Sequence, residues 1–282
     1  MQPNPLLIDL HAHLDHPYFE NDLDEVIERA KQAGLKIILI AGVNPSSNRK
    51  VLELCKKYNI LKAALGIYPV DALQKEIETG EYPLKSQPFD IDEEIAFIQK
   101  SKNRIYAIGE CGLDYHWIKD KKESQKVLFQ KIIDLCERIH KPLIVHSRKA
   151  EQDCIEMLKS SSLKKVNFHC FHGSKKLIKE IINKGWYFSV PTNIVRSQQF
   201  QELVKEVPLS HLFCETDSPY LSPYKPQKSK IFGSRKSKDF LGDKKNEPAF
   251  IIESYKKIAE LKGMDLVEIA NNIYMNWQRV FT

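Results

Sequence analysis

The chain has 282 residues, of which 42% are hydrophobic, and its formal net charge at pH 7 is +6. A chain of this length can bury a large core, so a single domain over residues 1–282 accounts for all of it. The longest apolar run, residues 37–43, is too short to span a bilayer, and no basic stretch followed by a long apolar one opens the chain. The sequence therefore predicts neither a transmembrane helix nor a secretory leader.

Apolar runs rich in β-branched residues alternate with longer stretches of helical periodicity. Eight such runs predict strands, at residues 6–10, 36–41, 62–66, 105–109, 142–146, 166–170, 186–190 and 211–215. Helices are predicted at 22–33, 46–58, 91–102, 122–140, 150–159, 175–184 and 198–207, with one or two more after residue 247. Such alternation indicates parallel strands joined by right-handed helical crossovers. We expect a (β/α)8 TIM barrel, although a doubly wound open sheet would give similar alternation.

Metal-binding side chains recur at the carboxyl ends of five of the predicted strands. In TIM barrels the carboxyl ends of all strands face one opening, where the catalytic residues gather. This recurrence favours the barrel over the open sheet. The candidate ligands are His11, His13, Glu110, His146, His169 and Asp217.

The chemistry of these residue types points to hydrolysis. His11 and His13 lie two residues apart in an extended segment, so both imidazoles face the same side, although an HxH pair alone is a weak signal. Glu110 adds a carboxylate able to bridge two cations, and Asp217 adds one that can bind a metal and take a proton from water. Histidine and carboxylate ligands favour Zn, Mn, Co or Ni, with Mg as a further candidate. Two divalent ions about 3.5–4 Å apart can activate a shared water and neutralise a phosphoryl group.

The positive charge is concentrated in one segment. Residues 225–245 contain eight cations and two anions, so this run alone carries a net charge of +6 and the remaining chain is neutral in sum. Such a run is either a solvated loop or a surface that attracts a polyanion. The six cysteines form no CxxC pair, which fits a reducing compartment, and we expect a cytoplasmic protein.

Six segments of the chain together resemble the signature blocks of the TatD family of metal-dependent deoxyribonucleases. They occur in the family's order, and the resemblance runs from near residue 8 to the C-terminus. The segments are Asp9-Leu10-His11-Ala12-His13, Ala107-Ile108-Gly109-Glu110-Cys111-Gly112-Leu113-Asp114-Tyr115, Pro142-Leu143-Ile144-Val145-His146-Ser147-Arg148, His169-Cys170-Phe171, Glu215-Thr216-Asp217-Ser218-Pro219-Tyr220-Leu221 and Asn246-Glu247-Pro248.

This resemblance implies a barrel of the amidohydrolase type that hydrolyses DNA phosphodiester bonds, often from the 3' end. Carried over block by block, one metal would be held by His11, His13, Glu110 and Asp217, and the other by Glu110, His146 and His169. Glu110 would bridge the two ions, and Asp217 would orient or deprotonate the attacking water. Arg148 would reach a phosphate oxygen, with a structural ion pair as the alternative. The implied partner is DNA, single-stranded or at 3' ends, with no membrane and no obligate protein partner.

The chain departs from the family pattern where the family usually carries Gly-Ile-His-Pro-His. Here the block reads Gly66-Ile67-Tyr68-Pro69-Val70, so both histidines are lost. Tyr68 can donate a hydrogen bond to substrate, but tyrosine is a poorer general acid than histidine near neutrality.

Three further features bear on substrate contact. His172 stands where the family tends to have Ser or Thr, and His116 follows the Glu110 block; both are candidate substrate contacts, with a plain loop histidine as the alternative for His172. The basic run at 225–245 is a loop insertion between the last two blocks. Beside a phosphodiester-cleaving centre it would raise the local concentration of nucleic acid.

Three functions remain open from the sequence. The first is a metal-dependent deoxyribonuclease, the second a barrel hydrolase of a small amide, ester or lactone, and the third a nucleic-acid-binding protein that has lost catalysis. The intact ligand set argues against the third. No position for a carboxylated lysine is evident at the fourth strand, and the basic run suits a polymeric anion better than a neutral small molecule. The second survives because a fold does not fix a function.

Overall fold

The computed structural model describes residues 5–73, 87–224 and 245–282. All but the last residue of the basic run at 225–245 therefore lies outside the described residues. The described strands are β1 (Leu7–Ala12), β2 (Leu35–Ala41), β3 (Leu61–Leu65), β4 (Ala107–Asp114), β5 (Leu143–Arg148), β6 (Val166–His169), β7 (Tyr187–Pro191) and β8 (Leu212–Glu215). The helices are α1 (Leu23–Gln32), α2 (Pro45–Lys57), α3 (Pro69–Leu73), α4 (Ile91–Lys100), α5 (Lys122–Ile139), α6 (Glu151–Lys159), α7 (Lys175–Asn183), α8 (Gln198–Glu206), α9 (Ile252–Lys262) and α10 (Leu266–Phe281).

The strands form one sheet whose order follows the sequence, from β1 to β8. Pairing is parallel wherever a register is defined, as between β4 and β5, where Gly112 pairs with His146 and Asp114 with Arg148. All eight predicted strands and all seven predicted crossover helices are present. The sequential order is that of a (β/α)8 barrel, because a doubly wound sheet reverses its strand order part-way.

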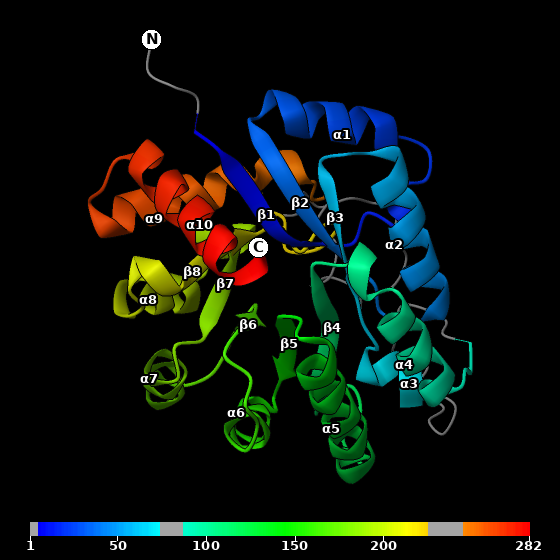
Figure 1. Cartoon of the computed structure of the whole chain (residues 1–282). Helices are drawn as coiled ribbons and strands as arrows, with labels where there is room; N and C mark the ends of the chain where they lie inside the picture. Colours follow the sequence, from blue (N-terminus) through cyan, green and yellow to red (C-terminus); the bar gives the residue numbers. More distant parts are fainter. Residues whose placement is uncertain (1–4, 74–86, 225–244) are drawn as a thin grey trace, which may run out of the picture. The chain divides into compact units, whose positions relative to one another are not determined.

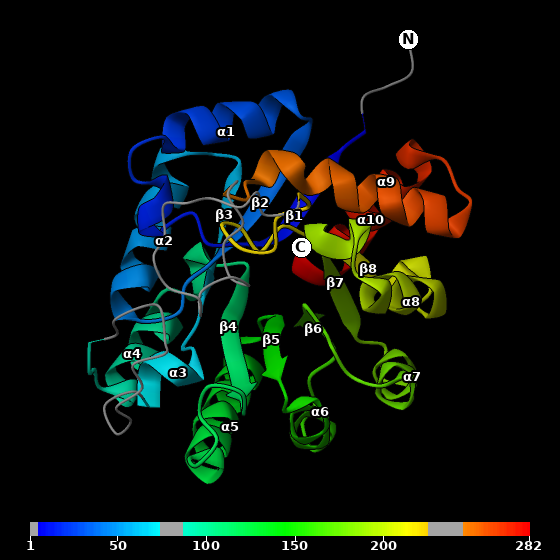
Figure 2. The same cartoon turned by 180° about the vertical axis from the view of Figure 1, so that it is seen from behind.

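The chain divides into two compact units, which are described separately. The first, here called the β1/β8 unit, comprises residues 1–40 and 189–279. In it a parallel bridge joins Ala12, at the end of β1, to Ser218, just beyond β8. The buried Tyr255 of α9 ties that helix to β1, since its hydroxyl accepts from the backbone amide of Ile8 at 3.0 Å and donates to the carbonyl of the same residue at 3.1 Å. Figure 2 shows α8 and α9 side by side in this unit.

The second, here called the β4/β5 unit, comprises residues 41–188 and 280–282. Its core is the sheet β3 to β6, and α5 lies along β4 with its apolar face buried (Figure 1). The buried Asn48 of α2 fixes the end of β3, because its amide group donates to the carbonyl of Gly66 at 2.9 Å and accepts from the Gly66 amide at 3.1 Å. This contact holds the segment that leads into Tyr68.

Two clamps in the β1/β8 unit hold the described chain on either side of residues 225–244. On one side, Arg196 donates to the carbonyl oxygens of Ser222 and Tyr224, at 2.9 and 3.0 Å. On the other side, Lys245 donates to Asp22 at 2.7 Å. Asn246 then donates its backbone amide to the carbonyl of Pro219 at 3.1 Å, and Arg29 binds Glu247 through two contacts of 2.8 and 2.6 Å. Both ends of this stretch are therefore anchored to described residues.

Two further sequence predictions concern compartment and domain number. None of the described helices is both long and apolar enough to cross a membrane. All six cysteines carry free thiols, and four of them are buried. Location in the cytoplasm and organisation as a single domain stay predictions.

Candidate metal centre

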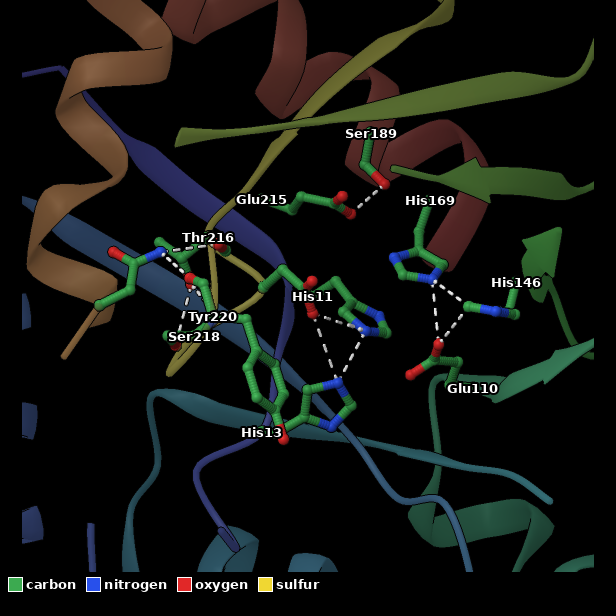
Figure 3. Close-up of polar contacts among 12 residues, drawn as sticks. His11, His13, Glu110, His146, His169, Ser189, Glu215, Thr216, Ser218 and Tyr220 are labelled. Carbon is green, nitrogen blue, oxygen red and sulfur yellow. Dashed lines mark hydrogen bonds and ion pairs between the residues drawn. The ribbon is translucent and has the colours of Figure 1, made fainter. Parts of the chain in front are cut away.

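Three predicted ligands come together in the β1/β8 unit. His11 lies in β1, His13 follows it directly, and Asp217 lies two residues after β8. The Nε2 atoms of the two histidines are 3.1 Å apart, and the carboxylate oxygen Oδ1 of Asp217 lies 3.6 Å from the first and 3.5 Å from the second. Figure 3 shows the imidazoles of His11 and His13 turned toward one another. All three side chains are largely buried.

The spacing of these three atoms fits a single divalent ion. Zinc-like ions bind histidine nitrogen and carboxylate oxygen at about 2.0–2.2 Å, so two ligand atoms around a tetrahedral ion stand about 3.4 Å apart. The three observed separations lie on either side of that value. The group His11, His13 and Asp217 therefore has the donor chemistry and the geometry of a metal site.

The buried carboxylate of Asp9 helps to position the ligand group His11, His13 and Asp217. Asp9 of β1 accepts from the backbone amide of Thr216 at 2.8 Å and contacts the Thr216 hydroxyl at 2.6 Å. Thr216 directly precedes Asp217, whose own amide donates to the carbonyl of His11 at 2.8 Å. Burial raises the pKa of Asp9 to about 8. These contacts fix the backbone of β1 against the segment after β8, which sets the separation of the three ligands.

The other three predicted ligands come together in the β4/β5 unit. Glu110 lies within β4, His146 within β5, and His169 is the last residue of β6. Glu110 Oε1 is 2.8 Å from His146 Nδ1 and 3.0 Å from His169 Nε2, and those two nitrogens are 3.2 Å apart. Figure 3 shows the carboxylate of Glu110 facing both rings. Neighbouring ligands of an octahedral ion stand about 2.9 Å apart, so these separations also suit a divalent cation.

A hydrogen-bonded chain behind His146 determines which of its nitrogens faces the ligand group. His146 Nε2 contacts Asp114 Oδ2 at 2.9 Å, and the hydroxyl of Tyr68 donates to the same oxygen at 2.8 Å. The other carboxylate oxygen accepts from the backbone amides of His116 and Trp117, at 2.9 and 2.8 Å. The carboxylate is thus fixed from both sides and directs His146 Nδ1 toward Glu110. Carboxylates in this position orient ligand histidines and raise their basicity.

The contacts between His146 and Asp114 shift the pKa of both side chains. Burial lowers the pKa of His146, but its hydrogen bonds to Asp114 and Glu110 outweigh burial, and the net shift is upward. Burial raises the pKa of Asp114, but the contact with His146 outweighs it, and the net shift is downward. The pair therefore favours a charged imidazole beside a charged carboxylate. A cation bound at Nδ1 competes with a proton, so we expect metal affinity to rise with pH.

Gly112 permits the close approach of β4 and β5 at this point. Its φ is +143°, and a Cβ placed on it would lie 2.0 Å from the carbonyl oxygen of His146. Gly112→Ala is expected to lower the free energy of unfolding by about 3 kcal/mol, through backbone strain and overpacking, in a urea titration. Gly185→Ala is the matched control, because Gly185 also has positive φ, +73°, but a Cβ there meets nothing within 4 Å. Equal losses for both variants would show that the contact with His146 carries no cost.

The predicted substrate contacts have different surroundings within the β4/β5 unit. The guanidinium of Arg148 lies 5.3 Å from the ring centre of Trp117, and the ring of His116 meets the same tryptophan edge-on at 4.8 Å. His172 is exposed and contacts the carbonyl oxygen of Cys170 at 2.7 Å. Tyr68 is only 8% exposed. The roles of these four residues in substrate binding stay predictions.

The two positions that depart from the family pattern lie in an apolar cluster. Tyr68 and Val70 are buried together with Ile118, and Trp117 packs against them. Where the family pattern places two histidines, this chain has a mostly apolar patch with a single hydroxyl, and that hydroxyl is bonded to Asp114.

Comparison with known proteins decides the family. The TatD related DNase family matches residues 8–282. The chain belongs to the TatD family. It is 33% identical to an uncharacterized metal-dependent hydrolase of Bacillus subtilis over 98% of this chain and 99% of that protein. It is also 33% identical to a human deoxyribonuclease, TATDN3, over 98% of this chain and 94% of that protein. The protein is therefore a metal-dependent hydrolase of the TatD family, as the sequence motifs predicted.

The fold is shared more widely. An uncharacterized amidohydrolase from Saccharomyces cerevisiae superimposes with a TM-score of 0.79, covering 98% of this chain and all of that one, at 18% identity. That likeness concerns the fold alone. Together with the sequential strand order, it confirms the prediction of an amidohydrolase-type TIM barrel.

Several contacts around the ligands were not predicted from the sequence. The hydrogen bond from Tyr68 to Asp114 joins residues 46 positions apart. In the β1/β8 unit, the buried Ser189 of β7 contacts the buried Glu215 of β8 at 2.5 Å (Figure 3). The sequence places Glu215 in the family block that contains Asp217. Only the structure shows that Ser189 is the hydrogen-bond partner of Glu215.

Proposed function

We propose that this protein is a metal-dependent deoxyribonuclease that uses two divalent ions and acts on single-stranded DNA or 3' ends as a 3'–5' exonuclease. The observation that carries the proposal is the pair of buried ligand groups, each with histidine and carboxylate atoms at metal-ligand spacing, in a chain of the TatD family. A human relative that bears the name deoxyribonuclease supports DNA as the substrate class.

As the resemblance to the family implies, Glu110 would be a ligand to both ions. His11, His13 and Asp217 would complete the shell of one ion, and His146 with His169 that of the other. The ions, drawn from Zn, Mn, Co, Ni and Mg, supply Lewis acidity toward a water and a phosphate oxygen. Asp217 would accept a proton from the attacking water, and Arg148 would bind a phosphate oxygen of the substrate.

The basic run at 225–245 would add electrostatic attraction for the nucleic acid. Its net charge of +6 equals that of the whole chain. A cytoplasmic location is part of this proposal, and the six free thiols support it because they suit a reducing compartment.

A screen of substrates against metals tests the proposal. The apo-protein is loaded in turn with Mg, Mn, Co, Ni and Zn and offered single-stranded DNA, double-stranded DNA, RNA, and a panel of lactones, esters and amides. We expect metal-dependent shortening of single-stranded DNA from its 3' end, blocked by a 3'-terminal phosphorothioate and abolished by a chelator. Hydrolysis of a lactone, ester or amide with every nucleic acid left intact would refute the proposal.

A further inference from the structure

A row of four aromatic rings in the β1/β8 unit leads from a metal-ligand candidate to the protein surface. It begins at His13, whose ring meets Tyr220 edge-on at 6.2 Å between ring centres. Tyr220 meets His16 edge-on at 5.8 Å, and His16 stacks almost flat on Tyr18, with centres 4.8 Å apart and planes inclined by 10°. Figure 3 shows the first step, with the ring of Tyr220 beside His13. Tyr18 is 47% exposed, so the row ends at solvent.

The outer part of this row is held in place by several contacts. The backbone amide of Tyr18 donates to His16 Nδ1 at 3.1 Å, which caps the short 3-10 helix Pro17–Phe19. The carbonyl of Tyr18 accepts from Lys245 at 2.8 Å, and Phe19 beneath it is fully buried. Tyr18 therefore sits on a turn fixed at both of its backbone groups. An aromatic ring held this way offers a stacking surface without the entropy cost of ordering a loop.

The surroundings of Tyr18, the last ring of the row, favour a flat aromatic ligand over a phosphate. Lys245, the cation that contacts the carbonyl of Tyr18, is already paired with Asp22 at 2.7 and 2.9 Å. One face of the Tyr18 ring stacks on His16, and the residue as a whole is 47% exposed. Every nucleobase has such a face, and stacking on aromatic side chains is how proteins bind single strands without reading their sequence. A solvent-exposed tyrosine alone would mean little; its place at the end of a row that starts at a metal ligand is what points to substrate.

We propose that Tyr18, backed by His16, is a stacking platform for a base of the single-stranded nucleic-acid substrate, one of the nucleotides that flank the scissile phosphate. This inference rests on the proposed function, because it presumes that nucleic acid is the substrate. It adds a subsite that binds a base irrespective of its identity. Tyr18→Phe keeps the stacking ring and so keeps the subsite, whereas Tyr18→Ala removes it.

Binding without cleavage tests the platform. The metal-loaded protein is titrated into a fluorescein-labelled single-stranded oligonucleotide whose phosphorothioate linkages resist cleavage, and Kd is read from fluorescence polarisation. A second set of oligonucleotides carries one abasic site, moved in single steps from the 3' end. We expect Tyr18→Ala to weaken binding of the intact strand by about tenfold. With the abasic site at one particular position, the wild-type protein should bind about tenfold more weakly than it binds the intact strand. The affinity of Tyr18→Ala should be the same for that abasic strand as for the intact one.

The controls separate this inference from the proposed function. Tyr106→Ala removes a partly exposed tyrosine that directly precedes β4, at the strand end opposite to the ligands, and should leave Kd unchanged. Zinc affinity, measured on the apo-protein by competition with a chromogenic chelator, should be equal for wild type and Tyr18→Ala, because Tyr18 is not a candidate metal ligand. If wild-type protein binds no single strand, the proposed function fails. If it binds and Tyr18→Ala loses affinity equally for intact and every abasic strand, or loses none, the platform alone is refuted.

Discussion

Replacing Asp217 by asparagine is expected to lower the rate of DNA cleavage by about 10²- to 10⁴-fold while leaving the fold intact. The amide has the size of the carboxylate but can neither take a proton from water nor place a negative charge 3.6 and 3.5 Å from the nitrogens of His11 and His13. Asparagine also tolerates the left-handed backbone of this residue, whose φ is +53°. The rate is measured with each metal at saturation, and folding is checked by thermal unfolding.

A matched substitution elsewhere isolates the chemical effect. Asp265 is an exposed residue at the start of α10, where its carboxylate caps the backbone amide of Val267 at 2.8 Å. Asparagine caps helices as well as aspartate does, so Asp265→Asn should change neither rate nor stability. Activity of Asp217→Asn within a few-fold of wild type would remove Asp217 from the catalytic machinery.

Replacing Asp114 by asparagine is expected to weaken metal binding by about 10- to 100-fold. Its carboxylate accepts from Tyr68 and contacts His146 through one oxygen, and it accepts two backbone amides through the other. The asparagine side chain has an NH2 group where the carboxylate has its second oxygen. That NH2 group would face at least one of the N–H or O–H groups that now donate to Asp114, so His146 loses its orientation and basicity. The affinity is measured on the apo-protein by competition with a chromogenic chelator for Zn and Co, which requires no activity.

Two further variants grade this effect. Tyr68→Phe removes one hydrogen bond from Asp114 and keeps the ring, so it should weaken metal binding by about fivefold, which corresponds to about 1 kcal/mol. Asp120→Asn changes an exposed carboxylate in the segment that follows β4 and should have no effect. If Asp114→Asn binds both metals as tightly as wild type, the contact with His146 serves only to hold the loop.

The secondary structure was predictable because apolar periodicity and strand length are local properties of the chain. Even so, β4 continues to Asp114 where the prediction ended it at Gly109, so Glu110 lies inside the strand and not behind it. The glycines at 109 and 112 weakened the strand pattern there. Gly112 stays in the strand because β4 and β5 approach too closely for a side chain. The helix α3 was not predicted, because it begins at Pro69 and only five residues of it lie in the described part of the chain.

The grouping of the candidate ligands was predictable for a different reason. Their residue types are rare at strand ends, and strand polarity alone brings them to one edge. Their supporting contacts were not predictable, since each depends on a pairing between distant segments. Tyr68 illustrates this: the sequence suggested a substrate contact, whereas the structure shows its hydroxyl bonded to Asp114 in a buried cluster. No local pattern identifies such a partner.

The two clamps fix the described chain on both sides of residues 225–244. Arg196 fastens one boundary, and Lys245 with Glu247 fastens the other, while the amide of Asn246 closes the gap to Pro219 at 3.1 Å. None of these anchoring contacts uses a residue from 225–244. An engineer can therefore replace that cationic stretch by another binding peptide and keep both attachment points.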